Sequence, residues 1–304
     1  MKDYLNEINQ KFPTRRDKSE KDAFFEYVKQ ELSEYSVEKE TLEDNDNIII
    51  GDLQSAPVVF TAHYDTPATS IFPNVMMPRN KILSMVYHLG CPLLLALLAL
   101  AIAFGINSLI GKQLPVAVGI YLVLYYTFWY FGTRCFKNKN NKNDNTSGVA
   151  TILTLAKQVN GKCAFILFDN EEKGLKGSKA IAKAKNELFK DKLVVNFDCV
   201  GNGNEFVFIA KEGALKSPTY ELLIKTFEKS PAFNLNYFPY KGSSSNSDYK
   251  NFDLGVGVMA CKKGKACKYL TSKIHTNKDV VANSENVYYL ANESAKFVNK
   301  LTEI

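Results

Sequence analysis

The chain has 304 residues, of which 46% are hydrophobic and 23% are charged, as expected for a globular protein of one or two domains. Its formal net charge of +6 is localised, because residues 66–143 contain seven Lys and Arg residues and no Asp or Glu. The rest of the chain therefore carries a net charge of −1, which argues against nucleic acid as a partner.

The cysteines and the N-terminal residues indicate a reducing compartment. The six cysteines are scattered without the C-x-x-C spacing of metal sites, so no disulfide framework is predicted. Residues 1–20 are polar and charged, and they lack the apolar centre of a secretory signal. We therefore expect the bulk of the chain to lie in the cytoplasm.

The first predicted elements are a helix and a strand. Residues 18–35 carry apolar side chains at helical spacing, which predicts a surface helix. Residues 56–62 are rich in β-forming side chains and predict a buried strand, which leads directly into His63-Tyr64-Asp65.

Two long uncharged runs follow, and they predict a transmembrane hairpin. Residues 82–111 contain no formal charge, and residues 113–133 form a second uncharged run that is rich in aromatic side chains. A membrane-spanning helix needs about 20 predominantly apolar residues, whereas a buried helix of a soluble protein rarely exceeds about 14 without a polar face. The lipid bilayer is therefore an expected partner of this segment.

The charges around the two runs predict their orientation, because positively charged loops stay in the cytoplasm. Only Lys112 lies at the tip, whereas six basic residues flank the hairpin, namely Arg79, Lys81, Arg134, Lys137, Lys139 and Lys142. We therefore expect both termini on the cytoplasmic side of the cell membrane. His88 lies within the first run, and we interpret it as an interfacial histidine and not a metal ligand, because no acidic residue accompanies it.

Beyond the hairpin, predicted strands alternate with predicted helices. The strands cover residues 163–168, 193–197 and 255–260, and the helices cover residues 146–159 and 178–189. This alternation predicts an α/β fold, a three-layer αβα sandwich with a mostly parallel mixed central sheet, interrupted by the hairpin.

Polar side chains with metal-binding chemistry follow three of the predicted strands. They are His63 after the first strand, Glu171 and Glu172 after the second, and Asp198 after the third. In open α/β sheets, ligands bind outside the carboxyl ends of the strands, where the loops converge. We therefore expect these side chains to meet at one edge of the sheet.

Two of the three histidines are closely followed by a carboxylate. Asp65 stands two residues after His63, and Asp279 stands four residues after His275. An imidazole that binds a metal commonly donates its second N–H to a carboxylate, which selects the tautomer. Asp65 is well placed for that role.

Six stretches, in this order along the chain, closely resemble the zinc aminopeptidases of metallopeptidase family twenty-eight, whose relatives include glutaminyl cyclases and glutamate carboxypeptidase. The stretches are Thr61-Ala62-His63-Tyr64-Asp65-Thr66, residues 143–150 (NDNTSGVA), residues 168–178 (FDNEEKGLKGS), Asn196-Phe197-Asp198, Ser247-Asp248-Tyr249 and Ile274-His275-Thr276.

The resemblance implies a site for two Zn²⁺ ions. Its implied ligands are two imidazoles and three carboxylates, namely His63, Asp144, Glu172, Asp198 and His275. Asp144 is expected to bridge the ions, with His63 and Asp198 completing one site and Glu172 and His275 completing the other. Such ligands suit Zn²⁺, although Co²⁺ or Mn²⁺ can replace it in the same ligand set.

The implied catalytic residues are Glu171 and Asp65. Glu171 is expected to act as the general base, taking a proton from water and delivering it to the leaving amine. The resemblance therefore implies a zinc-dependent metallo-aminopeptidase that removes N-terminal residues from peptides with a free N-terminus. We expect a catalytic domain formed by residues 1–78 and 137–304, with the hairpin at residues 79–136.

The chain departs from the family pattern in two places. The hairpin interrupts the domain between the first histidine motif and the Asp144 motif, and most soluble members lack it. Some relatives carry a tyrosine as oxyanion donor shortly before the Ser-Asp pair, whereas residues 242–246 are mostly serine here. The oxyanion donor is therefore unassigned.

Two alternatives use the same scaffold. One is a glutaminyl-cyclase-like transferase, which Trp129 disfavours, because the related cyclases line their pocket with tryptophan and the only tryptophan here lies in the hairpin. The other is a non-catalytic membrane receptor or scaffold, which is expected to have lost one or more ligands, although none is missing.

Overall fold

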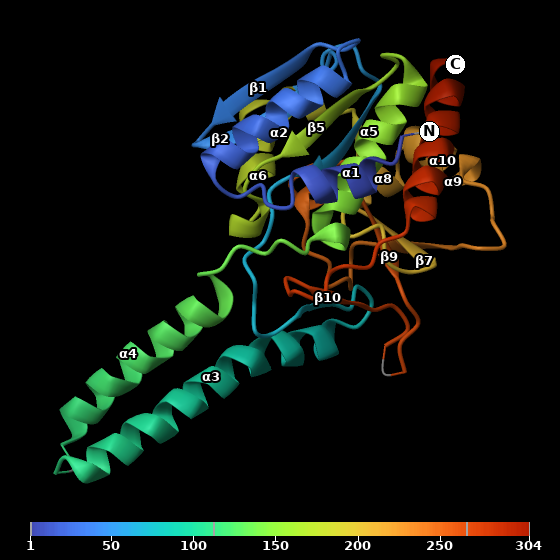
Figure 1. The fold of residues 1–304 in the computed structure, drawn as a ribbon. Helices are drawn as coiled ribbons and strands as arrows, with labels where there is room; N and C mark the ends of the chain where they lie inside the picture. Colours follow the sequence, from blue (N-terminus) through green and yellow to red (C-terminus); the bar gives the residue numbers. More distant parts are fainter. Residues whose placement is uncertain (1, 112, 266, 304) are drawn as a thin grey trace.

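The computed structural model describes residues 2–111, 113–265 and 267–303. Its centre is an eight-stranded mixed sheet with the strand order β1-β2-β5-β3-β6-β9-β7-β8, and a small second sheet pairs β10 with β4 (Figure 1). The strands are β1 (Val37–Leu42), β2 (Asn45–Ile50), β3 (Val58–His63), β4 (Asn74–Met76), β5 (Ala164–Phe168), β6 (Leu193–Phe197), β7 (Glu205–Ala210), β8 (Asn234–Pro239), β9 (Gly255–Cys261) and β10 (Thr271–Ile274).

Helices cover the sheet, and two further helices project from it. The helices are α1 (Tyr4–Lys11), α2 (Lys18–Glu31), α3 (Lys81–Leu109), α4 (Leu114–Thr133), η1 (Lys142–Thr146), α5 (Ser147–Val159), η2 (Glu171–Lys173), α6 (Lys176–Ala184), α7 (Asn186–Phe189), α8 (Glu212–Leu215), α9 (Pro218–Thr226), η3 (Asp248–Asn251) and α10 (Ser284–Thr302).

The middle of the sheet is parallel, since β5, β3, β6 and β9 all run in the same direction. The pairings of β2 with β5 and of β7 with β9 are antiparallel, so the sheet is mixed. Each central strand is buried along its whole length, as expected when helices cover both faces. The predicted three-layer α/β fold is confirmed.

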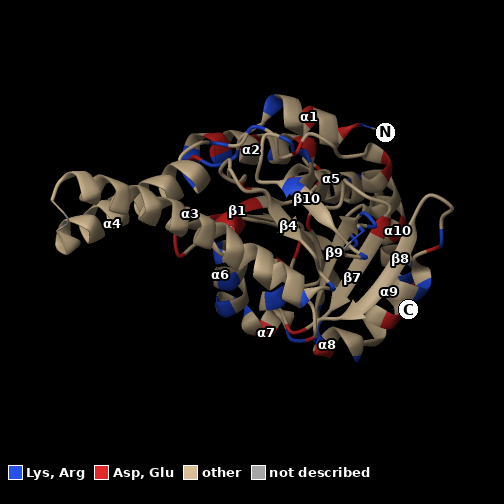
Figure 2. Ribbon diagram, turned by 90° about the horizontal axis from the view of Figure 1, so that it is seen from below, with Lys and Arg blue, Asp and Glu red and all other residues tan. Residues whose placement is uncertain are grey.

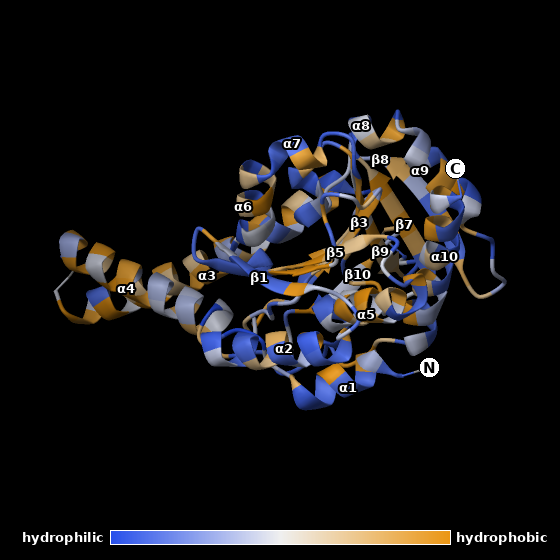
Figure 3. Cartoon of the chain, turned by 90° about the horizontal axis from the view of Figure 1, so that it is seen from above, coloured by the Kyte–Doolittle hydropathy of each residue, from blue (hydrophilic) through white to orange (hydrophobic). Residues whose placement is uncertain are grey.

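Alternating side chains of the central strands build two separate cores. In β3, Val58 and Phe60 point into the larger core, which also contains side chains of α2, α5 and α10. Val59 points to the opposite face, where α6 contributes Ile181 and α7 contributes Phe189. Period-two alternation thus places hydrophobic side chains on both faces. The strands at the centre of the sheet are accordingly hydrophobic (Figure 3).

Two predicted helices differ from the observed ones. The single helix predicted over residues 178–189 is divided into α6 and α7, because Lys185 leaves the helical conformation with φ −120° and ψ 29°. The helix predicted over residues 18–35 ends at Glu31. Tyr35 lies beyond the end of the helix. Its hydroxyl donates to the Ala156 carbonyl oxygen, and its ring packs edge-on against Phe165.

The helices α3 and α4 pack against each other and project from the domain as a hairpin (Figure 1). They are the two described helices that are long and apolar enough to cross a membrane by length and composition. Only 17% of the most apolar stretch of α3 and 6% of that of α4 is buried. Away from the domain the pair carries no charged side chain that the structure describes (Figure 2). Lys112, on which the predicted orientation depends, lies outside the described residues.

Candidate active site

The carboxyl ends of three neighbouring parallel strands position most of the candidate residues. His63 is the last residue of β3, Asp198 follows β6 directly, and Glu171 and Glu172 lie in the short helix η2 after β5. Asp144 lies in η1, immediately before α5. His275 comes directly after β10, so the second sheet carries it to the same edge.

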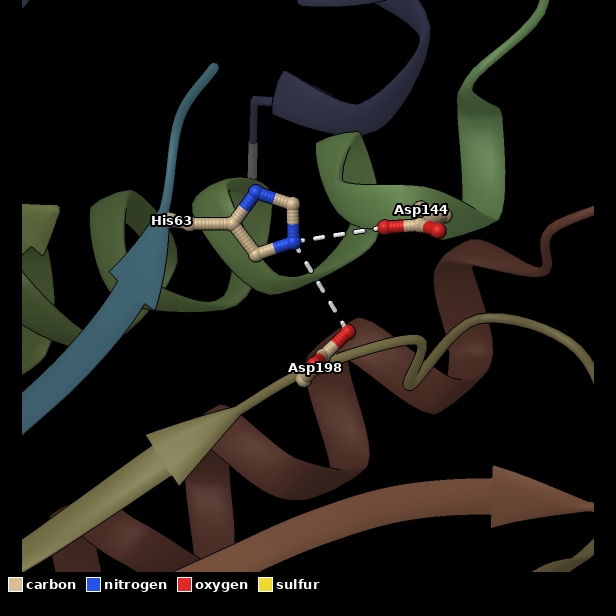
Figure 4. Close-up of side chains that lie close together, drawn as sticks. All are labelled: His63, Asp144 and Asp198. Atoms are coloured by element: carbon tan, nitrogen blue, oxygen red, sulfur yellow. Dashed lines mark ion pairs between the residues drawn. The ribbon is translucent and has the colours of Figure 1, made fainter. Parts of the chain in front are cut away.

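The imidazoles of His63 and His275 lie on either side of Asp144. The Nε2 atom of His63 is 3.2 Å from Asp144 Oδ1, and the Nε2 atom of His275 is 3.1 Å from Asp144 Oδ2. His63 Nε2 is also 3.8 Å from Asp198 Oδ1 (Figure 4), and His275 Nε2 is 3.2 Å from Glu172 Oε2. Each imidazole therefore faces a different oxygen of Asp144, and each also faces a second carboxylate that the other does not.

Glu171 lies beside this cluster. One carboxylate oxygen of Glu171, one ring nitrogen of His63 and one oxygen of Glu172 all lie within 4.8 Å of one another. The seven residues singled out from the sequence, including Asp65, thus meet in one place.

The donor set fits Zn²⁺ in type and in spacing. Two ligand atoms at about 2.0 to 2.1 Å from one tetrahedral ion stand about 3.3 Å apart, close to the separations of 3.1 to 3.8 Å found here. Glu172 Oε1 is buried and has no hydrogen-bond partner among the described residues. A buried carboxylate oxygen without a partner is costly, and a cation would satisfy it.

The electrostatics of the cluster also favour cations. Burial opposes the charged form of His63, but the carboxylates of Glu171, Asp144 and Asp198 outweigh it and raise the pKa well above its ordinary value. The pKa of His275 is raised in the same way, with Glu172 as the strongest carboxylate neighbour. More carboxylates than imidazoles share this site, and divalent cations compensate such an excess of negative charge.

Burial is the main cause of the raised pKa of Glu171, which lies well above the usual range of a glutamate. The neighbouring carboxylates of Glu172, Asp248 and Asp198 raise it further, and His63 opposes them. A carboxylate with a raised pKa can hold a proton between taking it from one group and giving it to another. This is the property expected of the general base.

Asp65 contacts both parts of the candidate site. Its two carboxylate oxygens accept hydrogen bonds from the backbone N–H groups of Glu171 (3.0 Å) and Glu172 (3.2 Å). The Nδ1 atom of His63 lies 3.5 Å from Asp65 Oδ1 and 3.2 Å from the Asp65 backbone oxygen. Asp65 therefore contacts both the imidazole of His63 and the backbone of Glu171 and Glu172.

Two residues not included among the expected site residues position Asp144. Asp279 accepts hydrogen bonds from the backbone N–H groups of Asn143 and Asp144. The side chain of Asn145 donates to the Phe197 carbonyl oxygen and accepts from the backbone N–H of Cys199, so it links the Asp144 loop to the Asp198 loop. The spacing of Asp279 after His275 had drawn attention to it, but not to this role.

Arg15, whose guanidinium is fully buried, also contacts the site, and no pattern in the sequence had indicated this. It donates to the Tyr64 carbonyl oxygen (2.6 Å) and to the Thr146 hydroxyl (3.0 Å), on either side of the site. Burial is the main cause that lowers its pKa, to about 10, so Arg15 stays charged at neutral pH. Arg15 thus holds the loops that follow β3 and precede α5 together.

Backbone conformation at the site is unusual. Asn170, Cys199 and His275 have φ values of 50°, 56° and 60°, in the left-handed region that residues other than glycine rarely adopt. Asn170 precedes the candidate base Glu171, Cys199 follows the candidate ligand Asp198, and His275 is itself a candidate ligand. Strained conformations of this kind cluster at functional sites.

The serine-rich loop before Asp248 supplies no evident oxyanion donor. The hydroxyls of Ser243 and Ser244 donate to the backbone oxygens of Pro78 and Met77 and so tie the loop to the segment before α3. Asp248 is fully buried and accepts a hydrogen bond from the Ser178 hydroxyl. The oxyanion donor remains unassigned.

The same fold occurs in several solved structures. A Zn-dependent exopeptidase from Parabacteroides distasonis is 15% identical with a TM-score of 0.63, covering 97% of this chain and 95% of its own. The LapA aminopeptidase of Legionella pneumophila is 12% identical with a TM-score of 0.58, covering 98% and 70% respectively. The glutaminyl cyclase of Porphyromonas gingivalis is 11% identical with a TM-score of 0.56, covering 98% and 96%. None of the curated proteins compared with the chain matches it.

Fold and donor set together define an α/β protein with a candidate metal centre. The model of peptidase family M28 matches residues 137–295, and the chain belongs to this family. At these low identities, the solved structures establish the fold and leave the particular reaction open.

Proposed function

We propose that the protein is a membrane-anchored metallopeptidase with two Zn²⁺ ions, and that it removes N-terminal residues from peptides. The observation that carries the proposal is the position of Asp144, whose two oxygens each face one imidazole at 3.1 to 3.2 Å. A carboxylate in this position would hold both ions. His63 and Asp198 would complete the ligands of one ion, and Glu172 and His275 those of the other.

The zinc ions, when bound, acidify a coordinated water and stabilise negative charge on the scissile carbonyl oxygen. Glu171 would take the proton of the attacking water, because its half-buried carboxylate lies within 4.8 Å of the His63 and Glu172 ligand atoms. Glu171 then gives this proton to the leaving amine. Asp65 keeps Glu171 and Glu172 in place through their backbone N–H groups.

Membrane anchoring is supported by the long apolar hairpin of α3 and α4 with its exposed hydrophobic side chains. Basic residues at its domain end favour a cytoplasmic position for the catalytic domain, residues 1–78 and 137–304, and for both termini. Residues 79–136 then form the membrane insertion.

A glutaminyl-cyclase-like reaction is the second candidate, and one observation favours it. Trp129 does not lie apart from the site, as its place in the hairpin had suggested, but lines the same cavity as Glu172 and His275. The argument against a cyclase from the position of the only tryptophan is therefore wrong.

The test uses full-length protein in phosphatidylcholine vesicles. The substrates are aminoacyl chromogenic amides, N-blocked versions of the same amides, and a peptide with N-terminal glutamine. We expect cleavage of the free amides alone, loss of activity with a chelator, and about two zinc ions per chain. Pyroglutamate formation without amide cleavage would establish the cyclase reaction, and full activity in a chelator would exclude both.

A further inference from the structure

The cavity above the candidate metal site is bounded by the catalytic domain and by the hairpin. Its volume is about 450 Å³. Asp65, Glu172 and His275 line it from the domain, and Trp129 and Thr133 line it from the last turns of α4. The hairpin is therefore part of the wall of the active site.

A second cavity of about 230 Å³ continues from the first into the hairpin. The two cavities share five lining residues, namely Ser70, His88, Trp129, Thr133 and His275. Beyond these, the second cavity runs along one side of α3, where Tyr87, Cys91, Pro92 and Leu95 line it. We call this second cavity the hairpin groove. It is predominantly apolar and begins at His275, a candidate metal ligand.

The domain end of α3 fixes the groove relative to the metal site. On the side that faces the domain, Tyr87 donates a hydrogen bond to the Pro73 carbonyl oxygen, and His88 Nε2 lies 3.1 Å from Asn74 Oδ1. His88 is thus held by polar contacts, and among the described residues it belongs to no group that could hold a metal. These contacts tie the part of α3 that lines the groove to the domain that carries the candidate metal site.

The opposite side of the same turns faces away from the domain. Ile82, Met85, Val86 and Leu89 recur at helical spacing, and all are exposed, from 54% to 75% of their surface. Such a stripe is suited to the hydrocarbon of a bilayer. In a chain anchored by this hairpin, the bilayer surface therefore lies against the turns that line the groove.

We propose that the hairpin groove binds the apolar N-terminal side chain of a peptide that is dissolved in the cytoplasmic leaflet of the membrane. This proposal rests on the proposed aminopeptidase function. A peptide that enters along α3 places its first side chain in the groove and its first peptide bond beside Glu172 and His275. Charged side chains are disfavoured because none of the described residues that line the groove is an Asp, Glu, Lys or Arg. The preferred substrates are hydrophobic, membrane-partitioning peptides and not small soluble ones.

The test compares two substitutions on α3 that add the same ring. Cys91→Phe fills the groove, whereas Leu94→Phe adds a ring at an exposed position outside it. Both variants, in phosphatidylcholine vesicles, are assayed with Phe-Leu-Leu-Leu-amide and with Ala-Ala-amide. We expect the ratio of kcat/KM for the two substrates to fall about tenfold in Cys91→Phe, and to stay within about twofold of wild type in Leu94→Phe. An unchanged ratio in Cys91→Phe overturns the proposal.

A binding measurement separates this proposal from the proposed function. Trp129 is the only tryptophan of the chain and lines the groove, so its fluorescence reports occupancy. In a Glu171→Gln background, a peptide that begins with 4-bromophenylalanine is expected to quench Trp129, and Cys91→Phe is expected to weaken the quenching. Quenching without any cleavage by the wild-type enzyme supports the groove and refutes the aminopeptidase. Absence of quenching, or quenching by brominated lipid that the peptide cannot displace, overturns the groove whatever the activity.

Discussion

Asp65 connects the imidazole of His63 to the backbone of the two glutamates that follow β5. Replacing it by Asn keeps the shape but presents an NH2 group to one of two backbone N–H donors. We expect Asp65→Asn to lower kcat or the affinity for zinc by about 10- to 100-fold. Zinc titration and kcat measurements check this, and Asp52→Asn, at an exposed carboxylate, is the control. Unchanged kcat in Asp65→Asn would contradict the positioning role.

Substitutions of Glu171 and His275 are expected to have different effects on catalysis and on zinc binding. Glu171→Gln removes the proton acceptor and leaves the proposed ligands in place, so we expect kcat to fall by about 10² to 10⁴ while zinc stays bound. His275→Ala removes a proposed ligand and is expected to lower the zinc content itself. Elemental analysis and kinetics of both variants check this. Wild-type activity in Glu171→Gln would show that another group is the base.

At the scale of elements, the approach of α5 to β6 depends on a glycine. A Cβ atom at Gly148 would stand 2.4 Å from both Asn145 Oδ1 and the Phe197 carbonyl oxygen. Gly148→Ala is therefore expected to destabilise the fold by about 2 to 3 kcal/mol and to displace Asn145. Thermal unfolding checks this against Gly90→Ala, whose Cβ would meet nothing within 4 Å. Equal stability of the two variants would contradict this account of Gly148.

Glu20 links α2 to the segment after the hairpin and makes stability depend on pH. Burial opposes its charge, but a hydrogen bond from Lys137 and two from backbone N–H groups lower its pKa from 4.5 to about 2. Because the folded-state pKa is lowered, this stabilisation is present above about pH 4.5 and is lost as the pH falls towards 2.

Glu20→Gln keeps an acceptor for the backbone N–H groups and removes the charge. We expect the variant to be less stable than wild type by about 1 to 2 kcal/mol at pH 7, after allowance for solvent screening. The difference should shrink between pH 4.5 and 2. Urea unfolding at a series of pH values checks this. If the variant is still less stable than wild type at pH 2, packing and not charge causes the loss of stability.

The elements that carry the site were predicted from the sequence more completely than the rest. The buried strands β3, β5, β6 and β9 are hydrophobic runs, and their ends carry recognisable motifs. The edge strand β1 is not recognisable in this way, because its sequence Val-Glu-Lys-Glu-Thr-Leu is half charged and only its pairing with β2 makes it a strand. Arg15 and the role of Asp279 were missed for a related reason. The contacts of Arg15 with Thr146 and of Asp279 with Asp144 join residues more than 100 positions apart, which no local pattern encodes.

At the scale of the whole molecule, the basic residues that flank the hairpin predict its orientation in the membrane. We expect a reporter fused at Lys112 to lie outside the cell and reporters at either terminus to lie in the cytoplasm, because the basic flanks stay inside. Paired phosphatase and fluorescent-protein fusions check this. A cytoplasmic signal from the fusion at Lys112 would mean that the hairpin has the opposite orientation or does not cross the membrane.

The hairpin also interrupts the chain between His63 and Asp144, which lie on either side of it in sequence and in contact in space. If only the first helix crosses the bilayer during synthesis, these two residues are left on opposite sides of the membrane. Such a chain has no metal site at all. If the hairpin spans the membrane as proposed, maturation is therefore tied to complete insertion, and a wrongly inserted molecule is inactive without any separate inhibitor.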